Sequence, residues 1–459
     1  MIRGKQPEAQ KQGEFWVERA KLPALKAGLF YERVNATLSR IKFAEQVHAA
    51  CAEFYTARLD GRPPIDPVVF FKLLMVGFFE GLQSDRALAA RAEDSISVRA
   101  FLGYALEERT PDHTSLSKIR LRLGAAVFDA LLTLTVAALR AHGLLKGRNL
   151  GVDSSIIEAN ASLRHLVERN TEEDYRDYVK RLAQEAGIDP EDDAAVRRFD
   201  RRRPGKKMSN EQFKHAHDED ARVGRTKDGA CDMVYKPEIV VDLDTGAIVA
   251  AEVRPGDAHD AHGVTDRLLA AEQRLQQLAG QDPEKPEPLV AKVVSDKGYF
   301  TASEVAELQE VQFGTVICDP MRDVRKVDAL PVHEAEAVRA AWAETASEAG
   351  RALLRQRGQH LERAFAHVLD SAGQRRTTLR GRANIAKRFV AAAAIYNLSQ
   401  LLRALFGTGT PKQAQALTAK AKAALKGLET SAAEAGAALL ELLRASCPPL
   451  RTFRSRAAG

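Results

Sequence analysis

The amino-acid sequence predicts a mixed α/β protein whose central mixed sheet is covered by helices. Three observations predict this class. The middle of the chain alternates short β-branched runs with helical runs, Asp244-Thr245-Gly246 separates two apolar runs as a hairpin turn does, and helical texture precedes and follows this region. We expect three parts: helices at 1–147, an α/β core at 148–410, and an Ala/Lys-rich basic helical tail at 411–459.

The first part is predicted to consist of helices. Ser84 is a candidate N-cap for one of them, and Thr114 or Ser115 for another, because their side-chain oxygens can accept free backbone N–H groups. With Arg120 and Arg122 exposed, these short helices would suit a helix-turn-helix-like DNA reader, and a plain helical bundle explains the pattern equally well. The expected helices include Pro67–Leu82, Asp85–Glu93 and Ala125–His142.

The core region is predicted to contain five strands and one large insertion. A charged insertion at about 165–236, with a helix at 172–186, separates the first strand from the second. The chain is helical again from Glu334, with a break expected at Gly350. The expected strands are 150–159, 237–243, 247–253, 289–295 and 315–318, and the remaining helices are 258–278, 303–309 and 351–369.

Charge is distributed unevenly along the chain. From Arg351 to the C-terminus there are 19 Lys plus Arg against 5 Asp plus Glu, a net +14, whereas the whole chain carries +6 and the preceding residues therefore −8. This excess suits a polyanionic partner; a solvated lysine-rich tail is the alternative. No run reaches the ~20 apolar residues of a membrane span, and the charged first residues do not form a signal peptide. We expect no membrane partner and a cytoplasmic address.

Three acids lie within or beside apolar elements, where a charged carboxylate is unusual unless it has a function. Asp153 lies within the first strand, Asp296 ends the apolar strand LVAKVVS, and Glu362 lies beside an apolar helical stripe from which it could point at the sheet. Phosphodiester cleavage uses two Mg²⁺ ions about 4 Å apart, held by a few converging carboxylates. The three acids are therefore candidate metal ligands, and solvated turn or helix-surface acids are the alternative.

Other acids and histidines are weaker candidates. Asp242 and Asp244 flank the hairpin and are expected to serve its turn, while Glu158 could support the site from the end of the first strand. The histidine pairs lack the further partners that a zinc site needs. There is no GxxxxGK[ST] phosphate loop, which argues against a nucleotide hydrolase.

A basic cluster directly follows the segment with Glu362. Such groups beside a metal site would hold the phosphates that flank a reacting bond, and a solubilising surface is the alternative. The cluster consists of Arg375, Arg376, Arg380, Arg382, Lys387 and Arg388.

Seven segments, spread over most of residues 60–411, are recognisable together. They are PPIDPVVFFKLLMVGFFEGLQSDRALA, FLGYALEERTPDHTSLSKIR, GVDSSIIEANAS, KDGACDMVYKPEIVVDLDTGAIVAAEV, VVSDKGYF, RGQHLERAFAHVLDSAGQRRTTLRGRANIAKRF and AAIYNLSQLLRALFGTGTP. With these segments the sequence resembles the bacterial insertion-sequence transposases of the DDE superfamily. The segments occur in the order expected for that family, which is more specific than any single motif.

The resemblance implies a ribonuclease-H-like core behind a helical N-terminal DNA-binding domain. It implies that Asp153, Asp296 and Glu362 are the catalytic acids, holding two Mg²⁺ ions for which Mn²⁺ can substitute. Relatives often carry Tyr and Arg before the glutamate and Lys or Arg seven positions after it. Here position 369 is Leu and no tyrosine closely precedes Glu362, so Arg357 or Arg363 is the expected replacement.

The expected activity is that of a DNA transposase. It would bind the terminal inverted repeats of its element as double-stranded DNA, cleave there, and join the freed 3′-hydroxyl to target DNA by two-metal-ion phosphoryl transfer. A homodimer is expected in the active complex, because two element ends must be paired, and the protein would be associated with the nucleoid. The alternatives are a catalytically inactive DNA-binding relic or repressor of the same fold, and a nuclease without strand transfer.

Overall fold

The computed structural model describes residues 26–55, 64–204, 209–226, 228–281 and 288–416. The chain divides into two compact units, residues 1–409 and 410–459. All elements below belong to the first unit. The prediction of a helical tail at 411–459 falls almost entirely outside the described residues.

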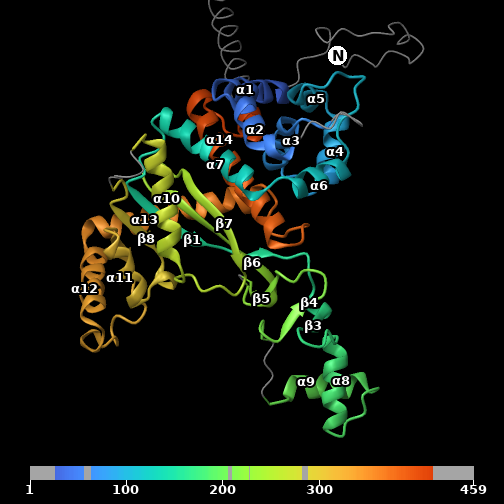
Figure 1. The fold of residues 1–459 in the computed structure, drawn as a ribbon, viewed down its shortest axis with the longest axis vertical. Coiled ribbons are helices and arrows are strands. Elements are labelled where there is room, and N and C mark those ends of the chain that lie inside the picture. Colours follow the sequence, from blue (N-terminus) through green and yellow to red (C-terminus); the bar gives the residue numbers. More distant parts are fainter. Residues whose placement is uncertain (1–25, 56–63, 205–208, 227, 282–287, 417–459) are drawn as a thin grey trace, which may run out of the picture. The chain divides into compact units, whose positions relative to one another are not determined.

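The centre of the first unit is a seven-stranded mixed sheet (Figure 1). Five strands lie in the order β7-β6-β1-β8-β9, with β6 antiparallel to β1 and β7, and with β8 parallel to β1 and β9. Strands β2 and β5 pair with the first half of β6. This order and these directions are those of a ribonuclease-H-like sheet, which confirms the predicted fold class. The bounds are β1 Asn149–Ser154, β2 Ile157–Glu158, β5 Arg222–Arg225, β6 Cys231–Asp242, β7 Ile248–Pro255, β8 Lys292–Ser295 and β9 Gly314–Ile317.

The hairpin between β6 and β7 forms where the sequence predicts it. Gly246 has a φ of +80°, a left-handed conformation that glycine adopts without strain. The buried Asp242 carboxylate accepts hydrogen bonds from the Thr245 hydroxyl at 2.8 Å and from the Asp244 N–H at 3.2 Å. The expected turn role of Asp242 is thereby confirmed. Strand β6 begins at Cys231, six residues before the predicted strand, so the end of the predicted insertion belongs to the sheet.

Four of the N-terminal helices, α3 to α6, begin at side-chain caps. Ser84 caps α4 by accepting from the Ala87 N–H, as predicted. The predicted cap of α6 was wrong: Asp112 accepts from the backbone N–H groups of Thr114 and Ser115, because its carboxylate, just before the helix, reaches both. The helices are α1 Lys26–Arg40, α2 Phe43–Cys51, η3 Ala52–Phe54, α3 Pro67–Glu80, α4 Asp85–Asp94, α5 Ile96–Leu102, α6 His113–Arg122 and α7 Ala125–Ala141.

The insertion between β2 and β5 has elements and an apolar core of its own. Its helices α8 (Tyr175–Glu185) and α9 (Asp193–Arg202) pack through the buried residues Val179, Ala183 and Val196. The short strands pair antiparallel with each other. These are β3 Leu166–Glu168, which follows the turn η4 Leu163–His165, and β4 Phe213–His215.

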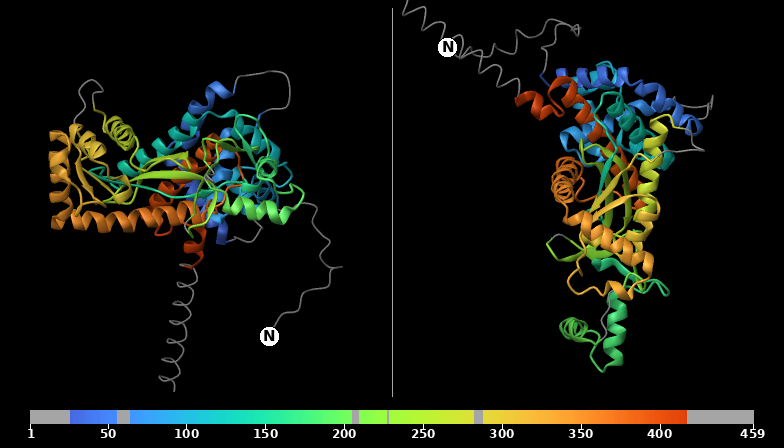
Figure 2. Two further views of the ribbon diagram at one scale, coloured as in Figure 1. Left: turned by 90° about the horizontal axis from the view of Figure 1, so that it is seen from below. Right: turned by 90° about the vertical axis from the view of Figure 1, so that its left-hand side faces the viewer.

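The helices after β7 cover the sheet. Helix α13 contacts β1 and β8, and its length along the sheet is visible in Figure 2. The predicted helix break occurs three residues before Gly350: α12 ends at Ala346, and the side chain of Ser347 caps α13 by accepting from the Gly350 N–H. The elements are α10 Val264–Leu278, η5 Lys297–Tyr299, α11 Ala302–Glu310, η6 Val327–Ala329, α12 Val332–Ala346, α13 Glu348–Phe365, the π-helical turn η7 Ala366–Ser371, and α14 Arg382–Phe406.

One helical segment, Arg382–Ala416, is long and apolar enough to cross a membrane by length and composition alone. Two bent helix pairs reach the same threshold only when each pair is taken as one span. In the segment that contains α14, 67% of the most apolar window is buried inside the protein. Helix α14 packs against α7 and β7, so its apolar length is accounted for by the core (Figure 1).

Two glycines of α13 provide a matched test of this packing. A Cβ at Gly350 would lie 2.0 Å from the Glu344 carbonyl oxygen, whereas a Cβ at Gly358 would meet nothing within 4 Å. We expect Gly350→Ala to lower the free energy of unfolding by about 2 kcal/mol or more, because backbone must move. Gly358→Ala should raise it by up to about 1 kcal/mol through helix propensity. Chemical denaturation measures both; equal effects would contradict the tight junction of α12 and α13.

Candidate active site

Two aspartates meet at the carboxyl ends of neighbouring parallel strands. Gly151 of β1 pairs with Val294 of β8, so Asp153 and Asp296, each two residues further on, occupy corresponding positions. Asp296 also begins the turn η5, where its carboxylate accepts from the Gly298 N–H at 2.9 Å. The parallel register therefore explains why residues 143 positions apart in the sequence lie together.

Helix α13 lies over β1 because Gly151 has no side chain. A Cβ at Gly151 would lie 2.5 Å from Leu243 and 3.2 Å from Leu361 of α13. Asp153 projects from the same face of β1 two residues later, and Arg357 precedes Leu361 by about one helical turn. The packing of Leu361 onto Gly151 thus places Arg357 over Asp153.

Arg357 bridges the two aspartates. Its Nη2 lies 2.9 Å from Asp153 Oδ2 and 3.9 Å from Asp296 Oδ2. The arginine side chain is 14% exposed, and its Nε is buried without a hydrogen-bond partner in the described structure. Two like charges at close range repel, and the guanidinium offsets that repulsion. A cation therefore already occupies the position where the carboxylates converge.

Burial dominates the protonation of Asp153. It raises the pKa of the Asp153 carboxyl to about 6, against the opposing effect of Arg357 and with a smaller contribution from the negative charge of Asp296. A carboxylate with such a pKa gains from a second cation, since neutralising its charge removes the cost of burial.

Glu362 does not join the aspartates in this structure. It lies five residues after Arg357 on the same helix, which turns it by about 140° around the helix axis. The side chain is exposed, so the expectation that it points at the sheet was wrong: the apolar stripe beside it faces inward. Among the described residues, no group of three or more His, Cys, Asp or Glu side chains is placed to hold a metal ion.

A third acid beside the pair was missed in the sequence. Asp260 lies in the loop between β7 and α10, and its Oδ1 accepts from the hydroxyl of Ser154 at 2.6 Å. The ammonium of Lys236 lies 2.7 Å from the same oxygen. Asp260 stands between two histidines in a loop without secondary structure, so no periodicity marks it. Its proximity to Asp153 results from the return of β7 alongside β6, which only the sheet topology reveals.

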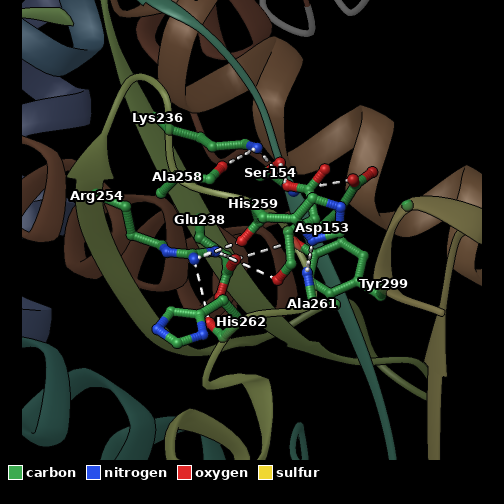
Figure 3. Close-up of polar contacts among 12 residues, drawn as sticks. Asp153, Ser154, Lys236, Glu238, Arg254, Ala258, His259, Ala261, His262 and Tyr299 are labelled. Carbon is green, nitrogen blue, oxygen red and sulfur yellow. Dashed lines mark hydrogen bonds and ion pairs between the residues drawn. The ribbon is translucent and has the colours of Figure 1, made fainter. Parts of the chain in front are cut away.

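A buried glutamate organises the backbone around Asp260 (Figure 3). Glu238 of β6 is 1% exposed; it accepts from Tyr299 at 2.9 Å and is paired with Arg254 and Arg267. Both arginines also donate to backbone carbonyls of the loop that carries Asp260. One buried carboxylate thus connects β6, the Asp260 loop and the turn after Asp296.

The predicted basic residues fall into two groups. Arg122, Arg363, Arg376, Arg380 and Arg382 are exposed. Arg375 is half-buried; it pairs with Asp370 at 2.8 Å and donates to Ser155 at 2.9 Å, next to the strand that carries Asp153.

The other basic residues are committed to interior contacts. Arg120, predicted to be exposed, is 7% exposed and pairs with Asp85 at 2.9 Å, which corrects that expectation. Lys387 is 9% exposed and donates to the Arg120 carbonyl. Arg388 donates to the Leu82 carbonyl, and burial lowers the pKa of its guanidinium to about 10. These three join α14 to the N-terminal helices and are poorly placed to reach DNA.

Comparison with known proteins agrees with this architecture. Residues 21–122 match the family model described as "Transposase domain (DUF772)", and residues 203–398 match that described as "Transposase DDE domain". Together the two models cover more than half of the chain. Asp153 precedes the second matched range, whereas Asp260, Asp296 and Glu362 lie within it. No curated protein matches the chain.

Two solved structures resemble the chain weakly. They are described as "Mos1 transposase paired-end complex with left transposon end" and "Crystal structure of a pre-cleavage Mos1 transpososome". The identities are 11% and 12%; in both cases the TM-score is 0.19, and the match covers 69% of this chain and 82% of the other. At this TM-score they add nothing to the argument from the sheet topology.

The structure is thus a ribonuclease-H-like fold with two aspartates at adjacent strand ends. With both family models matched in order, the chain belongs to the DDE transposases and is a DNA transposase.

The raised pKa of Asp153 makes a prediction about stability without divalent cations. The folded protein retains this proton to a higher pH than the unfolded chain, so folding loses stability as pH rises from about 4 to above 6. Asp153→Asn removes that loss. In EDTA, the variant should unfold like the parent at pH 4 and be more stable at pH 7.5, by roughly 2–3 kcal/mol at most. Thermal melts across pH test this, with the exposed Asp328→Asn as control; a difference that does not change with pH contradicts it.

Proposed function

We propose that this transposase cleaves and joins DNA with divalent cations held by Asp153 and Asp296, and that Glu362 joins them in the active state. The observation that carries the proposal is the shared contact of both aspartates with one guanidinium. Hard carboxylate oxygens converging on a positive charge fit Mg²⁺, or Mn²⁺ in its place. Two such ions, when bound, lower the pKa of water and offset the charge that develops on the attacked phosphodiester.

The aspartates, Arg357 and the exposed arginines have separate roles in the proposed reaction. Asp153 and Asp296 provide the negative charge at the sheet edge, on strands whose register is fixed. If bound cations neutralise the two aspartates, Arg357 is no longer held by them. Its N–H donors are then available to a phosphate oxygen. The exposed arginines after α13 bind the flanking phosphates. The freed 3′-hydroxyl attacks target DNA directly, without a covalent bond to the protein.

The DNA partners follow from the reaction class. We propose that the protein binds the terminal inverted repeats of its own element and then target DNA, that the helical N-terminal region reads the repeats, and that a homodimer pairs the two ends. The corresponding address is the cytoplasm, on the nucleoid.

A second candidate function is favoured by one observation. Glu362 is exposed and does not form a metal-holding group with the aspartates among the described residues, as expected if the protein is a catalytically inactive DNA-binding relic or repressor. The proposed active state requires α13 to rotate or the π-helical turn after it to shift register. Such turns accommodate an extra residue per helical turn and occur frequently at functional sites.

The acids are tested by isosteric amides. Asp153→Asn, Asp296→Asn and Glu362→Gln should each lower cleavage of a labelled element-end fragment by at least about 100-fold, because each removes a charge that holds a cation. DNA binding should persist, measured by gel shift. Glu348→Gln is the matched control, since Glu348 is an exposed glutamate of the same helix.

The outcomes separate the candidates. Cleavage followed by joining to a target plasmid in Mg²⁺ establishes transposition chemistry, and cleavage alone establishes a nuclease. A parent protein that binds DNA but never cleaves it supports the inactive relic. Full activity in Asp153→Asn or Asp296→Asn overturns the proposed site.

The exposed arginines give a separate prediction. Replacing Arg376, Arg380 and Arg382 together by alanine should weaken DNA binding and make it less sensitive to salt. The slope of log K against log salt should fall by up to about 2–3, because each lost phosphate contact removes roughly 0.9. Arg339→Ala, an exposed arginine of α12 paired with Asp328, should leave the slope unchanged. An unchanged slope in the triple variant would place the DNA on another surface.

A further inference from the structure

The aspartate pair has a carboxylate neighbour that the family motif does not contain. A Cβ at Gly298 would lie 3.1 Å from Asp260 Oδ2 and 3.1 Å from Asp296 Oδ1. The two carboxylates therefore flank one point of backbone, and their oxygens are separated by no more than twice that distance. The negative charge of Asp260 also contributes to the raised pKa of Asp153. Asp260 is thus a close neighbour of Asp296 and an electrostatic neighbour of Asp153.

The two oxygens of Asp260 have different environments. Oδ1 is held by the Ser154 hydroxyl and by the Lys236 ammonium, which also donates to the Ala258 carbonyl at 2.7 Å. Oδ2 faces the gap that glycine leaves at position 298, and the described residues provide it with no hydrogen-bond donor. The side chain is 27% exposed. Pairing with Lys236 uses only Oδ1 of Asp260 and leaves Oδ2 available to another ligand.

The loop that carries Asp260 is held more firmly than a surface connection. Arg254 and Arg267 donate to the carbonyls of His259, Asp260 and His262, and both arginines are paired with the buried Glu238. Charged pairs buried in this way are costly unless every partner is placed. Figure 3 shows the contacts of Arg254 with Glu238 and with this loop, beside Asp153 and Ser154. The network fixes the backbone of Asp260 against the end of β1.

We propose that Asp260 is a further ligand of the cation site, binding a divalent ion through Oδ2 together with Asp296. The inference rests on the proposed function, because the same aspartates form the site. The small residue at position 298 leaves room for the ion between the two carboxylates. Asp260 supplies a fixed carboxylate at this edge of the sheet without Glu362, so cation binding precedes the rearrangement of α13 and does not depend on it.

Binding of Mn²⁺ to the full-length protein without DNA, followed by electron paramagnetic resonance, tests the proposal independently of catalysis. Asp260→Asn keeps a side chain that still accepts from Ser154 and Lys236 but loses the charge. It should weaken Mn²⁺ binding by at least about tenfold, as loss of a ligand or its close support does. Asp257→Asn, an exposed acid of the same loop, is the matched control and should bind like the parent.

Lys236→Met separates a ligand from a structural partner. It removes the ion pair on Oδ1 together with a competing positive charge, so Mn²⁺ binding should be unchanged or tighter. Melting temperatures of all variants show whether they fold.

Each other outcome overturns the inference. Equal weakening in Asp260→Asn and Lys236→Met, with lowered melting temperatures, shows a structural role. Parental binding in Asp260→Asn with weakened binding in Asp153→Asn removes Asp260 from the site and leaves the proposed function standing. Parental binding in both removes the proposed function as well.

Discussion

The site depends on one electrostatic constraint: two carboxylates at adjacent strand ends cannot remain charged and close together without a cation between them. The parallel register of β1 and β8 forces Asp153 and Asp296 into this arrangement. In this structure the cation is the guanidinium of Arg357. The close packing of α13 over Gly151 places it there, so the position of a whole helix is linked to the charge of two side chains.

The two sides of the aspartate pair differ: the side near Glu238 is held by buried charge pairs, and the side near α13 is not. On the rigid side, Glu238 with its two arginines and Tyr299 fixes the backbone around Asp260 and the turn after Asp296. On the free side, α13 carries Arg357 inward and Glu362 outward, and it ends in a π-helical turn. Replacing the guanidinium by metal ions would remove what holds Arg357 in place. The same helix could then offer its arginine to a phosphate and its glutamate to an ion.

Much of the fold could be predicted from the sequence, because strands and buried helices have local signatures. The strand before Asp296, the hairpin at Gly246 and the Ser84 cap follow from apolar runs and turn chemistry. The helix phase of Glu362 could not be predicted by the same means. Adjacency to an apolar stripe does not fix which side of that stripe a residue occupies, and about 100° per residue separates inward from exposed positions.

Contacts between residues far apart in the sequence could not be predicted from local sequence patterns either. Arg120 has the texture of an exposed helix residue, yet Asp85 neutralises it in the interior. Asp260 gave no signal, since its role depends on the distance between a loop and a strand end over 100 residues away. The resemblance to DDE transposases supplied the order of the acids, but it could not supply the arginine between them or the acid beside them.

The most direct test is a crystal structure of the full chain grown with Mn²⁺, with anomalous scattering used to locate the ions. The account predicts anomalous density between Asp153 and Asp296, with Arg357 withdrawn from both carboxylates. A protein that shows no density there, with Arg357 still bridging the aspartates at saturating Mn²⁺, would contradict it.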